Sequence, residues 1–228
     1  MADPDRAGLR VLLAGQAEPS LVQATSKAFA EAGCRVARVA DRMESGTLAG
    51  LDVCVCFARG AAPASLMQTE DEAWERDLER HLLGPRRLAM AAAREMAASA
   101  GGSIVLVGSA DAFHAYPGRS VASVAMGGLL GLTRSMAVEL ARLGIRTNLV
   151  VAGPMGTDEG VPPAGADPSL VDRTLLRSPV HRFARPTEVA AAIRFVAGPD
   201  AAFMTGQTLR VDGGWSSLNQ APEGMRFP

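Results

Sequence analysis

Short apolar runs alternate with longer stretches of helical periodicity along the chain. The runs at 9–14, 35–40, 52–57, 103–108, 146–151 and 207–211 predict strands. The stretches at 21–32, 71–98, 120–143 and 186–197 predict helices, the last of them opening on Pro186. Alternation of this kind is typical of an α/β protein whose parallel sheet is covered by crossover helices.

The second and third predicted strands lie unusually close together in the sequence. Residues 42–50 make up most of the segment between these two strands. A crossover between parallel strands needs about 10–12 residues or more, helix included. The segment therefore has room for one short connection, and not for a helix, a strand and a second helix.

Length and composition narrow the class of protein. The 228 residues fit a single domain, 1–228, with a C-terminal tail at 216–228. The hydrophobic content of 48% argues against disorder, and the net charge of −1 argues against nucleic-acid binding. Residues 1–10 lack the apolar stretch of a signal peptide, and no apolar run reaches the roughly 18 residues of a membrane span. We therefore expect a cytoplasmic protein with no membrane partner.

Three cysteines are present, at Cys34, Cys54 and Cys56. Cys54 and Cys56 share one face of a predicted strand because side chains alternate along it. No His or Cys follows at a spacing that would complete a metal site. We expect buried, reduced thiols that act as small hydrophobic side chains and bind no metal.

The C-terminal third carries the most specific motifs. They are Gly-Ile-Arg-Thr-Asn at 144–148, Gly153-Pro154 with Thr157, the segment 181–190, and Thr-Gly-Gln-Thr-Leu-Arg-Val-Asp-Gly-Gly-Trp at 205–215. In this order and spacing, the chain resembles the short-chain dehydrogenase/reductase family over roughly residues 9 to 215. The resemblance implies a Rossmann-like doubly wound sheet with a nucleotide crevice where the strand order reverses. It also implies that one strand–helix unit is missing between the family's second and fourth strands.

The positions that hold the family's cofactor differ in this chain. Gly15 matches the start of the phosphate loop, but the next two glycine positions are occupied by Pro19 and Leu21. Pro19 also lacks the backbone N–H that a phosphate would need. Phe57 and Arg59 are bulky where the nicotinamide ribose would lie, although Phe57 also suits a role in the core. We expect these side chains to crowd the crevice, and no NAD or NADP to bind to this chain.

The missing unit would also remove the wall that contacts the adenine. Asp41 follows the second strand, where an acidic residue of the family holds a ribose hydroxyl. Without the glycine loop and the adenine wall beside it, we expect Asp41 to be a solvated surface charge.

The catalytic set of the family is also incomplete. Ser109 matches its Ser, and Pro117-Gly118 confirms the register. The Tyr position is then Ala122 and the Lys position is Met126, while the Asn of the preceding helix corresponds to His81. In the family, Tyr moves the proton of the substrate hydroxyl and Lys lowers the pKa of that Tyr. Ser109 is left as a vestige, and we predict that the chain is inactive as a dehydrogenase.

Other residues could supply proton transfer in the old substrate cleft. His114 and Tyr116, the single Tyr of the chain, lie on the loop after Ser109, and His81 could approach from the neighbouring helix. Imidazole is the side chain best suited to acid–base chemistry near neutral pH. A structural role remains open for each of these histidines, and His181 is expected to be a surface or capping residue.

The resemblance implies three candidate functions. The first is a non-catalytic subunit that joins an active paralogue in a heterotetramer through helices 71–98 and 120–143 and the C-terminal segment. The paralogue would carry NAD or NADP, as in hetero-oligomeric hydroxyacyl-CoA dehydrogenases of the benzylsuccinate-pathway type, and Gly127 and Gly128 would allow close helix contact. The second is a cofactor-independent lyase, isomerase or cyclase with 157–179 as a covering loop. The third is a ligand-binding protein.

Overall fold

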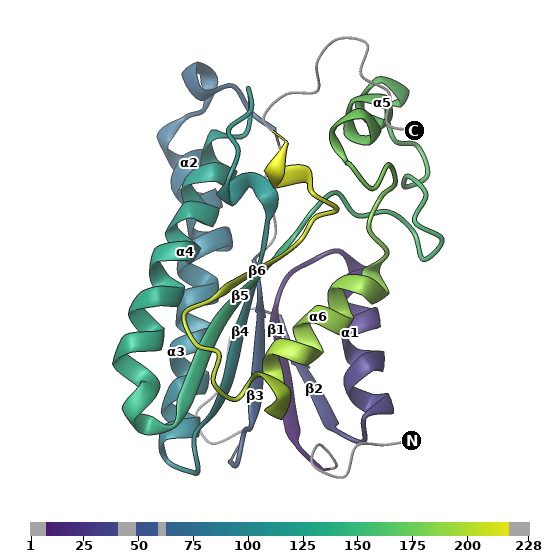
Figure 1. Cartoon of the computed structure of the whole chain (residues 1–228). Coiled ribbons are helices and arrows are strands. Elements are labelled where there is room, and N and C mark those ends of the chain that lie inside the picture. Colours follow the sequence, from purple (N-terminus) through teal and green to yellow (C-terminus); the bar gives the residue numbers. More distant parts are fainter. Residues whose placement is uncertain (1–7, 41–48, 59–62, 219–228) are drawn as a thin grey trace.

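A parallel sheet of six strands forms the centre of the protein (Figure 1). The computed structural model describes residues 8–40, 49–58 and 63–218. The strand order is β2-β1-β3-β4-β5-β6, and every neighbouring pair is parallel. The strands are β1 (Arg10–Gly15), β2 (Arg35–Val39), β3 (Val53–Phe57), β4 (Gly102–Ser109), β5 (Ile145–Ala152) and β6 (Thr208–Val211).

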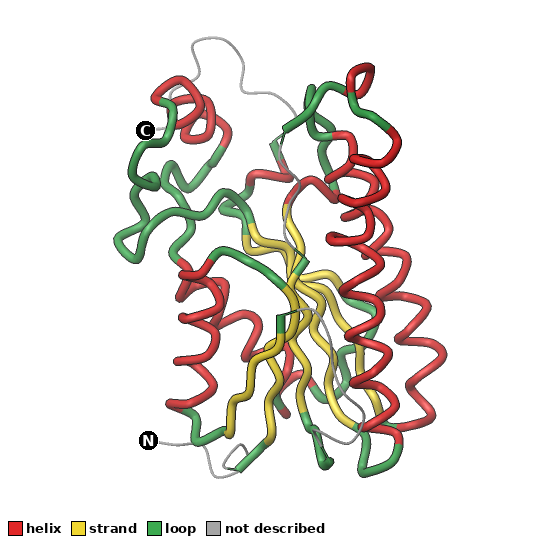
Figure 2. Tube along the Cα trace, turned by 180° about the vertical axis from the view of Figure 1, so that it is seen from behind, coloured by secondary structure: helices red, strands yellow, loops and turns green. Residues whose placement is uncertain are grey.

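Helices cover both faces of this sheet, as Figure 2 shows from behind. On one face lie α1 (Pro19–Glu31) and α6 (Pro186–Ala197). On the other lie α2 (Asp71–Leu78), a π-helical turn (Glu79–Leu83), α3 (Gly84–Ala97) and α4 (Ser120–Leu140). The helix α5 (Pro168–Arg177) stands above the carboxyl ends of the strands (Figure 1). Five short 3-10 turns complete the described part, at Leu66–Gln68, Ala110–Ala112, Ala141–Leu143, Pro199–Ala201 and Trp215–Ser217.

The fold predicted from the sequence is confirmed, including the missing unit. Within the described residues β2 pairs only with β1 and forms one edge of the sheet. The central strands are covered on both sides, and all five residues of β3 are buried. Cys54 and Cys56 lie in this strand with no exposed surface and their Sγ atoms 3.5 Å apart, and all three cysteines are free. No metal-binding group of His, Cys, Asp or Glu occurs among the described residues.

The predicted helix 71–98 is interrupted by the π-helical turn. Pro85 has no N–H to donate to the carbonyl four residues back, and its ring crowds that turn. The preceding Gly84 donates instead to Glu79 O, five residues back. The wider turn carries His81, whose side chain is 5% exposed. Single π-turns of this kind occur often at functional sites, and here the proline provides a local cause.

Side chains of the family motifs fix the ends of α6. Arg182 pairs with Glu188 through two hydrogen bonds of 2.8 and 2.6 Å, and Glu188 also accepts from Arg185 N. Hydrogen bonds from Arg182 lower the pKa of Glu188 to about 2. At the other end, Arg146 donates to the carbonyl oxygens of residues 196, 197, 198 and 204. These contacts satisfy the carbonyl groups that every helix leaves free at its C-terminus.

One segment of the described chain is long and apolar enough to cross a membrane, Ser120–Leu143, which comprises α4 and the following turn. The sequence analysis expected no apolar run as long as a membrane span, and by the length and hydropathy of this segment that expectation is wrong. The buried residues of α4, among them Met126 and Leu129, pack into the core beside β4 and β5. This arrangement is typical of a core helix that covers a sheet.

Candidate functional site

A cleft of about 860 Å³ opens at the carboxyl ends of β1, β3, β4 and β5. The chain leaves β1 toward one face of the sheet and β3 toward the other, so the cleft lies where the strand order reverses. This is the position at which doubly wound sheets bind their ligands. The cleft is lined by Ala17, Glu18, Ser20, Leu21, Phe57, Ala58, Val107, Gly108, Ser109, Ala152, Gly153, Met155, Gly156, Thr157, Asp158, Glu159, Pro163 and Ala164.

The cleft is not filled, so the prediction of a crowded crevice is wrong in this respect. Leu21 is 3% exposed and lines the cleft, whereas Pro19 is exposed and does not. Phe57 is 1% exposed and belongs to a core cluster, which agrees with the role in the core suggested by the sequence. It also forms part of the cleft lining. Asp41 and Arg59 lie outside the described residues. The effect of Pro19 is therefore the loss of a donor and not the loss of space.

Gly15 serves the fold at this point. Its φ is +85°, and a Cβ at this position would collide with the carbonyl oxygen of Phe57. A glycine is therefore required for β1 to turn beside β3, whether or not a phosphate binds there. Gly15 therefore acts as a turn residue of the fold.

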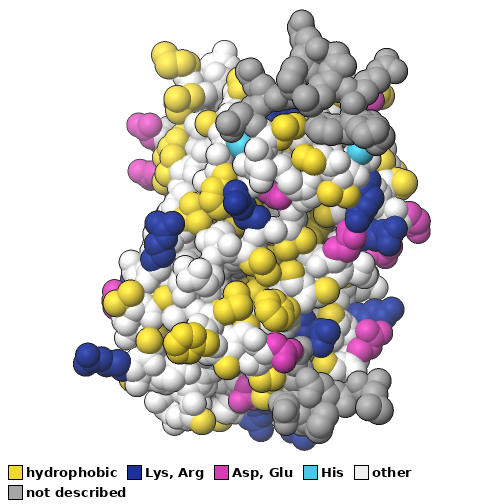
Figure 3. All heavy atoms as spheres, viewed as in Figure 1, with side chains coloured by type: hydrophobic (Ala, Val, Ile, Leu, Met, Phe, Trp, Pro, Cys, Tyr) yellow, Lys and Arg dark blue, Asp and Glu magenta, His cyan; other side chains and the backbone are white. Residues whose placement is uncertain are grey.

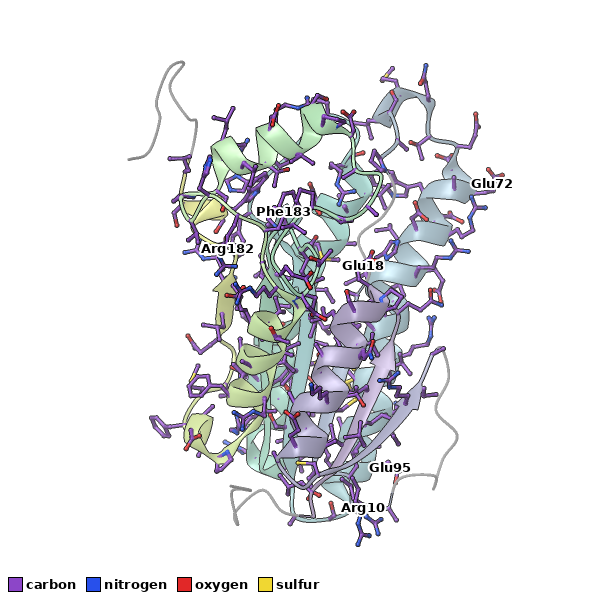
Figure 4. All side chains as sticks on the ribbon, turned by 90° about the vertical axis from the view of Figure 1, so that its right-hand side faces the viewer. Arg10, Glu18, Glu72, Glu95, Arg182 and Phe183 are labelled. Carbon is purple, nitrogen blue, oxygen red and sulfur yellow. The ribbon has the colours of Figure 1, made fainter. Side chains whose placement is uncertain are left out.

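The charge of the cleft is negative. Glu18, Asp158 and Glu159 line it, and no Lys, Arg or His occurs among its described lining residues. Figure 4 shows Glu18 at the upper end of α1, at the level where the sheet gives way to the loops. The Thr157 hydroxyl donates to Glu159 and lowers the pKa of that carboxyl. A dinucleotide pyrophosphate is bound by N–H donors or cations, and the described lining offers no cationic side chain for it.

Ser109 is held in a network of polar side chains at the end of β4. Its hydroxyl donates to Asp111 over 2.6 Å, and its N–H donates to the Met126 sulfur over 3.2 Å. Arg119 donates to both carboxylate oxygens of Asp111, over 3.1 and 2.7 Å. These hydrogen bonds raise the pKa of Arg119. The serine of the family site is thus tied to a carboxylate and a guanidinium.

The two positions that the sequence aligns with the family's Tyr and Lys are packed with apolar side chains. Ala122 is 1% exposed and lies against Trp74 and Leu78 of α2. Met126 is 1% exposed and belongs to the main core cluster. Neither residue can donate or accept a proton. The site therefore has no group in these two positions for moving the proton of a substrate hydroxyl.

The predicted alternative residues do not converge on the cleft. Ser109 lines it, but His81, His114 and Tyr116 are not among its lining residues. His81 lies buried in the π-helical turn. The rings of His114 and Tyr116 are 6.2 Å apart, and burial raises the pKa of Tyr116. Of the four residues predicted as a possible acid–base set, the described lining of this cleft therefore includes Ser109 alone, and the set stays a prediction.

Tyr116 belongs to a different cluster. The Arg177 guanidinium lies 4.9 Å from the centre of the Tyr116 ring and 5.1 Å from that of Trp215. Arg177 is the last residue of α5, a helix that the sequence did not predict within 157–179. His181 is exposed, as expected, with a left-handed φ of 54°.

Known proteins match most of the chain. The family model described as enoyl-(acyl carrier protein) reductase matches residues 35–216. The cis-4-hydroxycyclohexanecarboxylate dehydrogenase of Sinomonas cyclohexanicum is 38% identical over 185 residues, which cover 80% of this chain and 72% of that protein. The chain belongs to the short-chain dehydrogenase/reductase family.

Two further proteins similar to this chain bear on its differences from the family pattern. The inactive 2-(S)-hydroxypropyl-CoM dehydrogenase 2 of Xanthobacter autotrophicus is 35% identical over 191 residues, 82% of each protein. The gluconate 5-dehydrogenase of Burkholderia cenocepacia, solved with NADP and tartrate, has a TM-score of 0.82 at 25% identity over 94% of this chain and 98% of that one. The family-model match begins at residue 35, after the segment that would carry the phosphate loop.

Two features of the site escaped the sequence analysis. Asp111 follows Ser109 by two residues, and Arg119 follows Pro117-Gly118 directly. These two opposite charges near a serine were the sequence signal for the ion pair. Arg177 and Trp215 come together only through the fold, and no spacing in the sequence connects them.

Proposed function

We propose that this chain is a non-catalytic subunit of a hetero-oligomeric short-chain dehydrogenase/reductase. An active paralogue would carry the NAD or NADP and the Tyr–Lys dyad for an alcohol or hydroxyacyl substrate. The observation that carries the proposal is the pair of buried apolar residues, Ala122 and Met126, at the two dyad positions. A side chain without a titratable group cannot replace the proton transfer that Tyr performs.

The charge of the cleft supports the same proposal. Its acidic residues would oppose the two negative charges of a pyrophosphate, and Pro19 at the start of α1 offers no N–H. An intact member would instead present glycine N–H groups at this point. Binding of the dinucleotide by the partner alone accounts for both departures.

The outer surface of α3 and α4 supports an assembly role. Val124 and Val138 of α4 are 48% and 80% exposed, and Leu83, which ends the π-helical turn before α3, is 42% exposed. Gly127 and Gly131 of α4 face open space, where a Cβ would meet no atom within 4 Å. An apolar helix face with small residues allows another helix to approach closely.

A second apolar surface lies near α6 and β6. Figure 3 shows hydrophobic side chains gathered over the lower half of the face that these elements present. Phe195 of α6 and Phe203, before β6, are 41% and 105% exposed. Large exposed aromatic side chains are typical of interfaces, because they bury much area at low cost in conformational entropy. We assign this surface to a second contact within the heterotetramer.

The relative from Xanthobacter autotrophicus, named as inactive, gives independent support at the level of the family. A protein 35% identical to this chain is described as lacking its dehydrogenase activity. A member of the family that is named as inactive is thus among the proteins similar to this chain.

Co-expression tests the proposal. The chain is produced together with an intact member of the family, and any complex is purified and titrated with NAD and NADP. We expect stable co-purification with one dinucleotide site for each pair of subunits. A chain that purifies alone, and turns over a substrate without its neighbour, would contradict the proposal.

The isolated chain provides a second measurement. NADH and NADPH should leave its thermal midpoint unchanged, because a ligand stabilises a protein only by binding its native state. The double substitution Ala122→Tyr and Met126→Lys should not restore activity to the chain alone, since the cleft stays acidic. A saturable thermal shift with either dinucleotide would overturn this account.

One observation favours the second candidate, a cofactor-independent enzyme. The cleft remains open at about 860 Å³ beside Ser109, with Glu18 and Asp158 on its lining. Carboxylates can act as general acids or bases where a substrate brings its own reactive proton. Turnover by the isolated chain that survives removal of all nucleotide, and is lost in Ser109→Ala, would support this candidate.

A further inference from the structure

A polar cluster outside the cleft lining combines three separate segments. Tyr116 comes from the loop between β4 and α4, Arg177 from the end of α5, and Trp215 from the turn after β6. The Arg177 guanidinium contacts both aromatic rings, 4.9 and 5.1 Å from their centres. The two rings are 6.5 Å apart, and His114 lies on the other side of Tyr116. We define His114, Tyr116, Arg177 and Trp215 as the arginine cluster.

The backbone around each member is fixed by its own contacts. Asp212 is buried and accepts from Gly214 N and Ser216 N over 3.0 Å each, which shapes the turn that carries Trp215. Asp167 caps α5 by accepting from Ser169 N. The arginine cluster is therefore held in place before any ligand arrives, which reduces the entropy cost of binding.

Three polar atoms of the arginine cluster are buried without a hydrogen-bond partner among the described residues. They are His114 Nε2, Tyr116 Oη and Arg177 Nε. The Tyr116 hydroxyl interacts with the Trp215 side chain but makes no well-formed hydrogen bond to it. Buried polar atoms in native proteins are nearly always bonded, and an unpaired one destabilises the folded state. Three such atoms on neighbouring side chains point to a polar group that binds between them.

The charge of the arginine cluster is positive. No described carboxylate lies within ion-pair distance of Arg177, and the nearby Asp111 already pairs with Arg119. Burial of a guanidinium against two rings excludes water from its faces and leaves its N–H edge as the binding edge. An anion with at least two acceptor oxygens would satisfy the unpaired donors.

We infer that the arginine cluster binds the carboxylate group of a small organic acid. A planar carboxylate matches the two parallel N–H groups of guanidinium, and rings that stack on the guanidinium leave its plane free for such a partner. Tyr116 Oη and His114 Nε2 then donate to the same group. The inference does not depend on the proposed function, because a catalytic or a non-catalytic chain could hold an acid here.

Binding to the purified full chain tests the inference. Succinate is titrated by calorimetry against wild type, Arg177→Gln, Tyr116→Phe and Arg173→Gln, at constant ionic strength set with chloride. Arg173 is the matched control, because it is exposed on the same helix and donates only to the Ser169 carbonyl. We expect saturable binding to wild type and to Arg173→Gln. Affinity should fall at least about tenfold in Arg177→Gln and about fivefold in Tyr116→Phe, which removes one hydrogen bond.

Phosphate provides the second arm of the experiment. Tighter binding of inorganic phosphate than of succinate would overturn the carboxylate assignment. Absence of saturable succinate binding to wild type, or equal affinity in wild type and Arg177→Gln, would overturn the site. If circular dichroism shows that Arg177→Gln does not fold, the succinate titration is repeated with Tyr116→Phe and His114→Gln. Succinate affinity equal to that of wild type in both variants would refute the inference.

Discussion

The ion pair between Asp111 and Arg119 makes a specific prediction about the loop beside Ser109. Replacing Arg119 with Met keeps an extended apolar stem and removes both hydrogen bonds to the carboxylate. The Asp111 side chain is 9% exposed and that of Arg119 is 25% exposed, so the carboxylate regains little water when its partner is lost. It keeps only the hydroxyl of Ser109 as a donor.

The magnitude follows from these contacts. Hydrogen bonds to charged groups contribute about 1.5–3 kcal/mol each, and partial exposure of the arginine reduces the sum. We expect Arg119→Met to lower the free energy of unfolding by about 2–3 kcal/mol. For a chain of this size that corresponds to a fall of roughly 4–12 °C in Tm. Ser109→Ala, which removes one donor, should cost about half as much.

A double-mutant cycle measures the interaction itself. Urea unfolding of Asp111→Ala, Arg119→Met and the double variant should give a coupling energy of about 1.5–3 kcal/mol, because the double variant leaves no unpaired charge. Additive losses, with coupling below about 0.5 kcal/mol, would show that the pair does not stabilise the loop and would refute the reasoning.

Four further predictions concern α4, the C-terminal end of α6 and the Arg182–Glu188 pair. A Cβ at Gly128 would lie 2.7 Å from a methyl carbon of Leu82, so Gly128→Leu should lower Tm by overpacking at a cost of about 1–3 kcal/mol. A side chain at Gly127 would point into open space, so Gly127→Leu should keep Tm and change the gel-filtration elution volume of the assembly. A lower Tm with an unchanged elution volume would count against a subunit interface on the outer surface of α3 and α4. Arg146→Met should cost at least about 2 kcal/mol in urea unfolding, since four carbonyl groups lose their donor, and an unchanged midpoint would contradict this. The pKa of Glu188 is depressed from 4.5 to about 2, so its stabilisation is present above pH 4.5 and is lost as pH falls toward 2. Glu188→Gln should therefore flatten the decline of stability across that window, and a parallel decline in both proteins would exclude the effect.

Much of the fold could be predicted from the sequence because its signals are local. Apolar runs bounded by glycine mark the strands, and the short segment 42–50 excludes a further strand by length alone. The helix α5 was missed because its ten residues follow a Pro/Gly-rich loop and its N-terminal signals, Asp167 and Pro168, lie inside that loop. The π-helical turn was missed because the effect of Pro85 depends on which helix carbonyl loses its donor.

The candidate site could be predicted only in part. The predicted strand and helix that carry Ser109, Ala122 and Met126 are present as β4 and α4, while the assignment of these residues to the family's catalytic positions stays a prediction. The resemblance also led us to treat Gly127 and Gly128 as equivalent, but the helix turns one toward open space and the other onto Leu82. Contacts between distant segments, such as Arg177 with Trp215, depend on how long loops cross the sheet edge, which no local pattern specifies.

The shape of the cleft and its chemistry have separate causes, and this decides which departures matter for a cofactor. A Cβ at Gly153 would lie 2.6 Å from the Asp212 Cα, and one at Gly15 would meet the Phe57 carbonyl. These glycines are needed for the packing of neighbouring strands, so the room at the sheet edge persists without any ligand. Volume is therefore a poor guide to dinucleotide binding in this chain. The sign of the charge is the better feature to test, since Glu18 and its acidic neighbours would repel a pyrophosphate and added salt would screen that repulsion.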